Sequence, residues 1–210
     1  MGRRLLERAH ALIPALRERA SNTEALRRIP NETMRDLHDT ELLKAVQPER
    51  HGGFEVGLDD ALRITAALGR GCGATAWVYG VLSDHQITLG MYSAEAQEDV
   101  WGESPAAVAC SGLALGGEAR LAIGGYRVSG RWSFSSGSDH SAWVFVHSNA
   151  PTESEEQTRR TAYYLVPRDE FEIVYTWHVV RISGTRSNDI LIDDVFVPEH
   201  RRLFVDDANE

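Results

Sequence analysis

The hydrophobic period of this 210-residue chain changes once, near Trp101, and this change constrains the fold more than any other feature. Before Trp101, apolar residues recur at the spacing of amphipathic helices. After it come short runs rich in Val, Ile, Tyr and Phe, separated by Gly and Pro, which is typical of strands. Helices followed by strands predict an α+β protein, since an α/β fold requires the two to alternate. We expect an N-terminal helical domain over residues 1–112 and a small, mostly antiparallel β domain over residues 113–210.

Five helices are expected in the first half of the chain. Asn31 is placed to cap the second helix, and Ser93 opens the fifth. The fourth is apolar on nearly all sides, which predicts that it is buried. The expected segments are residues 1–20, 30–42, 57–71, 74–92 and 93–102.

The second half predicts a hairpin and four further strands. The hairpin turns at Gly124 and Gly125 within residues 119–132. The polar, acidic stretch 151–160 is expected to be an exposed loop. The further strand candidates are residues 142–148, 161–167, 171–177 and 189–198.

Composition excludes several classes of function. The formal net charge is −9 and no basic stripe occurs, which argues against a nucleic-acid partner. No run of about 18 apolar residues predicts a membrane span. Cys72 and Cys110 are isolated, no metal-ligand spacing is present, and the N-terminus lacks the apolar stretch of a signal peptide. We therefore expect a cytoplasmic protein without a metal site.

Three positions are candidates for chemistry, and the residues alone leave each of them open. His85 in VLSDHQ is either a hydrogen-bonded structural histidine or an acid or base that faces a pocket. Ser111 lies at the helix-to-sheet junction, where a turn or cap residue is the ordinary interpretation. Ser135 and Ser136 either form a bulge before Gly137 or present a hydroxyl and N–H to a flat ligand beside the neighbouring aromatic residues.

Three stretches, taken in order, resemble one known family. They read AWVYGVLSDHQITLGMYSAEAQEDVWGE, GGYRVSGRWSFSSGSDHSAWVFV and YYLVPRDEFEIVYTWHVVRISGTRSNDILIDDVFVPEHR. The chain resembles the acyl-CoA dehydrogenase fold, and more narrowly its flavin-dependent monooxygenase branch. The resemblance extends from about the first helix to Arg202, and its most specific part is the Trp-x-Phe-Ser-Ser-Gly-x-Asp-His segment that begins at Trp132.

The resemblance implies an oxygenase component of a two-component aromatic hydroxylase. Such proteins receive reduced FMN or FAD from a separate flavin reductase and use O2 as co-substrate. A C4a-hydroperoxyflavin then hydroxylates a phenolic or polyketide-like aromatic. The family fold has an N-terminal helical domain, a central β domain and a C-terminal four-helix bundle, with the flavin ring between the β domain and the helices.

The resemblance also assigns roles to individual residues. Ser136 takes the place of the Ser or Thr that hydrogen-bonds near flavin N5, and His85 takes the place of the histidine that meets the substrate phenol. Ser111 falls in the segment that faces the substrate. The remaining residues implied to lie at the cofactor are Trp132, Phe134, Ser135, Thr185 and Ser187.

Two departures from the family pattern keep other functions in view. Arg181 and Arg186 stand where the family has glycine, and Ser183 stands where it has arginine. The family's C-terminal bundle is absent, so we expect a homo-oligomer or a complementary helical chain to complete the site. The alternative is a truncated, non-catalytic homologue that binds flavin, a small molecule or a partner chain. Acyl-CoA dehydrogenase activity is the least favoured reading.

Overall fold

A computed structural model describes residues 1–151 and 160–205 of the chain, so most of the predicted loop 151–160 lies outside the described residues. Its first half is helical, as predicted, and residues 42–44 and 49–51 form short 3-10 turns. The helices are α1 (Gly2–Leu26), α2 (Asn31–Asp39), α3 (Leu58–Gly69), α4 (Gly73–Gly90) and α5 (Ala94–Trp101).

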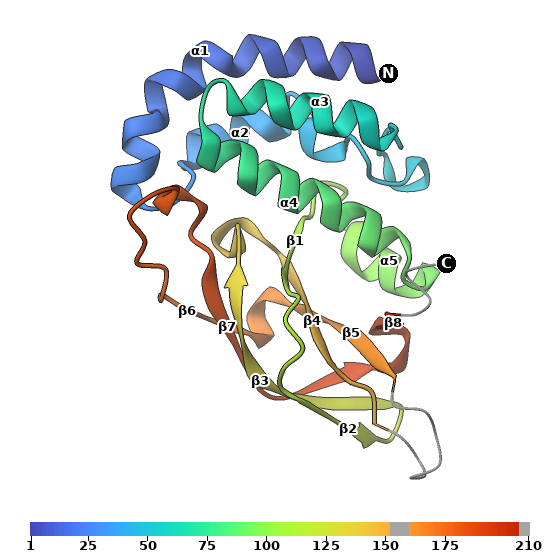
Figure 1. Ribbon diagram of the computed structural model, residues 1–210. Coiled ribbons are helices and arrows are strands. Elements are labelled where there is room, and N and C mark those ends of the chain that lie inside the picture. The colour runs from blue at the N-terminus through green and yellow to red at the C-terminus, as the bar shows by residue number, and fades with distance from the viewer. Residues whose placement is uncertain (152–159, 206–210) are drawn as a thin grey trace.

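Helix α4 is the central element of the structure. It lies between the outer helices α1 and α3 and the strands (Figure 1). Leu5, Leu16, Ile64 and Tyr79 are among the side chains that pack the helical core, and each is at most 1% exposed. Burial of these residues holds the helices together, because each buried aliphatic side chain contributes about 1.5–3 kcal/mol.

Two details of the helices differ from expectation. Asn31 is the first residue of α2, Pro30 occupies the cap position without a side-chain bond, and the Asn31 amide oxygen accepts from Arg28 instead. Ser93 does cap α5, since its hydroxyl accepts from the Ala96 N–H at 3.1 Å. One stripe of α4, which includes Trp77 and Asp84, is open to solvent, so this helix is not covered on all sides.

The described part of the second half forms two four-stranded sheets that are mostly antiparallel, as predicted. One sheet has the order β1-β4-β5-β8 and the other β2-β3-β7-β6. Only β1 and β4 run parallel among the described strands. The strands are β1 (Ala109–Gly112), β2 (Glu118–Ala122), β3 (Gly125–Ser135), β4 (Trp143–Asn149), β5 (Thr161–Pro167), β6 (Glu172–Val174), β7 (Asn188–Pro198) and β8 (Arg202–Phe204).

The β1–β4 sheet is covered on both faces. One face packs against the second sheet through residues such as Val144, Val146 and Ile190. The other face packs under α4 and α5, where Phe145 meets Trp101 and its neighbours. Because β1 pairs with β4, residues before 113 already contribute to the β domain. This arrangement brings α4, β1 and the end of β3 together.

Candidate active site

A cleft of about 320 Å³ opens where α4, β1 and the end of β3 meet. Helix α4 forms one side, the residues that follow β1 form the floor, and the end of β3 forms the other side. The cleft therefore collects side chains from three separate segments of the sequence. Its lining residues are Trp77, Gly80, Val81, Asp84, His85, Ser111, Leu113, Ala114, Ser133, Phe134 and Ser136.

His85 and Ser111 form a hydrogen-bonded pair at this cleft. His85 Nδ1 lies 2.8 Å from the Ala109 carbonyl oxygen, and since a carbonyl can only accept, Nδ1 carries the proton. Nε2 of the neutral ring then accepts from the Ser111 hydroxyl at 3.0 Å. Burial lowers the pKa of His85 from its ordinary value of 6.5, although the bond to Ala109 opposes that shift. The geometry therefore presents a neutral imidazole whose basic nitrogen is reached through Ser111.

Ser136 joins a chain of hydroxyl groups on the opposite side of the cleft. The Trp77 indole Nε1–H donates to Ser136 Oγ at 3.0 Å. Ser136 Oγ lies 2.7 Å from Ser187 Oγ, which lies 3.0 Å from Thr185 Oγ1. These bonds fix the Ser136 hydroxyl at the cleft surface, where it is positioned to bond one polar edge of a ligand.

Phe134 is held in a conformation that favours glycine. Its φ is +66°, its side chain is 71% exposed, and its ring meets Trp177 edge to face at 5.9 Å. A left-handed non-glycine residue costs about 1–3 kcal/mol, and such strain is concentrated at functional sites. An exposed aromatic ring in this conformation at the cleft edge is suited to pack against a flat ligand.

The structure places Trp132 and Ser135 away from the cleft. The Trp132 indole is 1% exposed in the β-sandwich core and donates to the His147 carbonyl at 2.9 Å. Ser135 is fully buried and its side chain does not line the cleft. Strand alternation explains both positions, because Trp132 points inward and a register shift before Ser135 turns that side chain inward as well. Thr185 is also buried and does not line the cleft, and its Oγ1 is linked to Ser136 through the Ser187 hydroxyl.

Two tryptophans, one that lines the cleft and one that contacts Phe134, were not singled out from the sequence. Trp77 is 53% exposed on the open stripe of α4, and Trp177 follows β6. A signal was available for Trp77, since it begins a series with Gly80, Val81 and Asp84 at helical spacing. No comparable signal existed for Trp177, because it lies in an irregular segment.

The residues that depart from the family pattern have defined contacts. Arg186 keeps a left-handed φ of +46°, its Nε lies 2.8 Å from the Asp139 carboxylate, and its guanidinium covers the Tyr175 ring. Ser183 binds Glu24 at the end of α1, through its N–H at 2.9 Å and its hydroxyl at 2.6 Å. The contacts of Arg186 hold it in this left-handed turn, whereas Arg181 is exposed.

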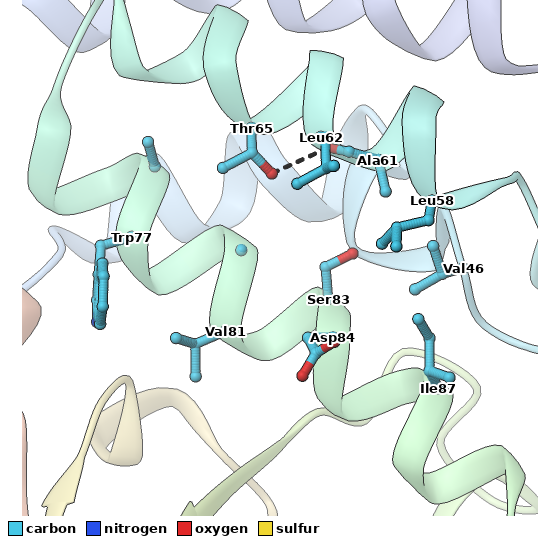
Figure 2. Close-up of a pocket in the computed structure, with 12 residues that line it drawn as sticks. Val46, Leu58, Ala61, Leu62, Thr65, Trp77, Val81, Ser83, Asp84 and Ile87 are labelled. Carbon is cyan, nitrogen blue, oxygen red and sulfur yellow. Dashed lines mark hydrogen bonds between the residues drawn. The ribbon is translucent and has the colours of Figure 1, made fainter. Parts of the chain in front are cut away.

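An apolar groove of about 250 Å³ lies between α3 and α4, next to the cleft. Figure 2 shows Leu58 and Leu62 projecting from α3 toward α4. Both are more than 60% exposed, which is uncommon for large aliphatic side chains. Trp77 and Val81 line both the groove and the cleft, so the two hollows share a border.

The cleft residues fit one side of a flavin ring. Such a ring is flat and apolar with polar atoms on its edges, and here an exposed aromatic side chain stands beside a fixed hydroxyl group. Within residues 1–151 and 160–205, no group of three or more His, Cys, Asp or Glu side chains could hold a metal ion. None of the helices that the structure describes is long and apolar enough to cross a bilayer.

Comparison with known proteins identifies the fold class of this chain. Residues 6–107 match the family model of the acyl-CoA dehydrogenase N-terminal domain. A crystal structure of the HsaA monooxygenase from M. tuberculosis superimposes with a TM-score of 0.91 at 37% identity, over 97% of this chain and 52% of that chain. The chain therefore has the fold of acyl-CoA dehydrogenase-like proteins.

The relatives define the family more narrowly. The chain is 38% identical over 200 residues to the oxygenase subunit HsaA of a flavin-dependent monooxygenase from Rhodococcus jostii, over 94% of this chain and 51% of that protein. It is 37% identical to the oxygenase component of an FADH(2)-dependent resorcinol hydroxylase from a Rhizobium strain, over 98% of this chain and 50% of that protein. The chain is thus a homologue of flavin-dependent monooxygenase oxygenase subunits, and it spans about half the length of these relatives.

Proposed function

We propose that this chain carries the flavin-facing and substrate-facing side of an oxygenase component that hydroxylates a phenolic or polyketide-like aromatic compound. The observation that carries the proposal is the cleft with the His85–Ser111 pair on one side and Phe134 with Ser136 on the other. The co-substrates are reduced FMN or FAD, supplied by a separate flavin reductase, and O2. The homologous hydroxylases described above support this assignment.

Phe134 and Ser136 hold the flavin in this proposal. A bound reduced flavin activates O2 for oxygen transfer to an aromatic ring. Phe134 packs beside the ring system, and the Ser136 hydroxyl, fixed by Trp77 and Ser187, bonds its polar edge. Trp77 and Val81 of α4 add apolar surface to the cleft here, and covering that surface would exclude the water that breaks down reactive species.

Ser111 and His85 handle the substrate proton. The Ser111 hydroxyl directs its hydrogen to His85 Nε2, so its lone pairs are available to a phenol O–H in the cleft. A proton passed from the phenol through Ser111 to Nε2 gives the substrate phenolate character, which makes its ring more electron-rich. His85 accepts this proton because its Nδ1–H is anchored on Ala109 and its Nε2 is neutral.

The α3–α4 groove supports the proposal that a further helical surface completes the site. Leu58, Leu62 and Trp77 present apolar area beside the cleft, and exposed apolar patches mark interaction surfaces. A homo-oligomer or a complementary helical chain is the proposed partner. Covering this groove would also close the cleft border that Trp77 and Val81 form.

The test of this function is incorporation of label from 18O2 into a phenol. Purified chain is supplied with reduced FMN or FAD, O2 and either resorcinol or p-hydroxyphenylacetate, alone and with a complementary helical chain. His85→Asn keeps an amide donor near the Nδ1 position but removes Nε2, so we expect labelled product to fall about 10²-fold or more. His140→Gln is the matched control, since His140 is also a largely buried histidine bonded to a carbonyl, that of Ile29 at 3.0 Å.

The outcomes separate the proposal from its alternative. Labelled product from the unmodified chain and the His140→Gln variant, but not from His85→Asn, supports the hydroxylase function. Equal product from all three variants contradicts the role of His85. Tight flavin binding with no labelled product under any condition favours a non-catalytic homologue. The Arg186–Asp139 ion pair in the 183–187 turn, where the family pattern has glycine, is consistent with that alternative.

A further inference from the structure

A further hollow, distinct from the cleft and from the α3–α4 groove, lies beside the C-terminal end of α1. It has a volume of about 140 Å³. Two arginines, a histidine and two aromatic rings contribute to its walls. Its lining residues are Arg27, Tyr175, Trp177, His178, Arg186 and Asn188.

Two residues that line this hollow, Asn188 and Trp177, carry buried donor groups without a hydrogen-bond partner among the described residues. Asn188 is 2% exposed, and its Oδ1 accepts from the Thr176 and Trp177 N–H groups at 3.2 and 3.3 Å. These bonds orient the amide so that Nδ2 is its remaining group. Neither Asn188 Nδ2 nor the Trp177 indole Nε1 has a hydrogen-bond partner within the described ranges 1–151 and 160–205. Such groups cost about 1–3 kcal/mol each when left unsatisfied, so they indicate an acceptor that the protein itself does not supply.

The nearby charges favour an anionic acceptor. Arg186 uses its Nε toward Asp139, which leaves the two terminal nitrogens of its guanidinium outside that contact. Arg27 donates to the Trp177 carbonyl, which anchors a second guanidinium at the hollow. Asp189, the nearest carboxylate along β7, is held by Arg131 at 2.7 Å and does not line this hollow.

We propose that this hollow binds a phosphate group. A phosphate offers several acceptor oxygens to the Asn188 amide and the Trp177 indole, and Arg27 and Arg186 match its charge and geometry. The hollow, of about 140 Å³, has room for a phosphate group. Arg186, which stands where the family pattern has glycine, makes this a property of this chain's own sequence.

Two sources can supply this phosphate, and they share the same chemistry. One is the phosphate of the flavin itself, a possibility that rests on the proposed function. Another hollow shares the lining residue Phe134 with the cleft, and it shares Trp177 and His178 with this site. The other source is free phosphate or an unrelated phosphate ester.

The first arm of the test measures inorganic phosphate binding to the full chain by titration calorimetry. Asn188→Asp keeps the acceptor for Thr176 and Trp177 but replaces the unpartnered donor with a negative oxygen. We expect it to weaken phosphate binding about tenfold or more, and Arg186→Gln to weaken it as well. Arg63→Gln is the control, since Arg63 lies on α3 and pairs only with nearby Asp59 and Asp60 among the described residues.

The second arm compares reduced FMN with reduced riboflavin, which lacks the phosphate. Tighter binding of FMN, with the difference lost in Asn188→Asp, assigns the site to the flavin phosphate. Inorganic phosphate binding that Asn188→Asp weakens, without an FMN preference, assigns it to another phosphate source. The proposal is overturned if folded wild-type chain binds no phosphate in either arm, or if Asn188→Asp, with an unchanged unfolding midpoint, binds as wild type does. Both binding measurements can be made and interpreted even if the hydroxylase assay gives no product.

Discussion

Arg186→Gly tests whether the ion pair at the 183–187 turn outweighs the backbone strain there. Arg186 has a φ of +46°, a conformation that costs an L-residue about 1–2 kcal/mol. Glycine would relieve this strain. However, its greater conformational freedom stabilises the unfolded chain and so offsets about 0.4–1 kcal/mol of that gain. The backbone alone therefore favours glycine by about 0.5–1 kcal/mol.

The side-chain contacts act in the other direction and are larger. The Asp139 side chain is 8% exposed and that of Arg186 is 25% exposed, so the pair lies between the exposed and buried limits. We assign it about 2–3 kcal/mol on that basis, and the contact with Tyr175 adds about 0.5–1 kcal/mol. The expected net effect of Arg186→Gly is a destabilisation of about 2 kcal/mol, or about 4–8 °C in Tm for a chain of this size.

The assay is urea unfolding followed by circular dichroism, with Arg186→Ala and Asp139→Asn as companions. Arg186→Ala retains the strain and loses the contacts, so it should be less stable than Arg186→Gly by about 1 kcal/mol. The double variant Arg186→Gly/Asp139→Asn leaves no unpaired carboxylate. Its loss in free energy of unfolding should therefore be smaller than the sum of the losses in the two single variants. A free energy of unfolding for Arg186→Gly equal to or above that of the unmodified chain would refute the reasoning.

Three further predictions concern the interior. Burial lowers the pKa values of His85 and His140 below 6.5, so as the pH falls these histidines take up protons in the unfolded chain before they do in the folded chain. The free energy of unfolding should therefore fall as the pH drops below 6.5. Urea titrations at several pH values should show a weaker fall for His85→Asn. Burial raises the pKa of Cys110 to about 11, so this thiol should resist alkylation at neutral pH until the chain unfolds, and early labelling by mass spectrometry would contradict this. Gly112→Ala would place a methyl group 2.5 Å from the buried Trp132 side chain, and thermal melts should show a loss of about 1–3 kcal/mol, whereas unchanged stability would mean that the strand moves freely.

Local sequence patterns predicted most of the secondary structure, but they did not predict the shortest strands. The apolar period located α3 and α4 to within a few residues, because each helix repeats its pattern over several turns. Strands β1 and β8 have four and three residues, too few for alternation to be visible. β6 ends at Val174, three residues before its predicted end, and Asn188 binds the backbone of Thr176 and Trp177 there instead.

Some residues of the candidate cleft could be predicted from the sequence, but the contacts between them could not. The resemblance pointed to His85, Ser111 and Ser136, and the structure brings all three to one cleft. Spacing could not reveal the Ser136–Ser187 bond, because 51 positions separate its partners and only the pairing of β3 with β7 brings them together. Nor could it show that the Trp132 indole points into the β core, since this depends on strand register.

The most direct test of this account is an anaerobic titration of the chain with reduced FMN and FAD, followed by equilibrium binding. Phe134→Gly is the informative variant, because glycine suits the φ of +66° and the exposed ring contributes little to stability. Ile123→Gly, which removes another exposed apolar side chain that does not line the cleft, is its control. We predict one flavin bound per chain, a loss of affinity of about tenfold or more in Phe134→Gly, and no loss in the control. Absence of saturable binding, or equal affinity in the Phe134→Gly variant, would contradict the assignment of this cleft to a flavin.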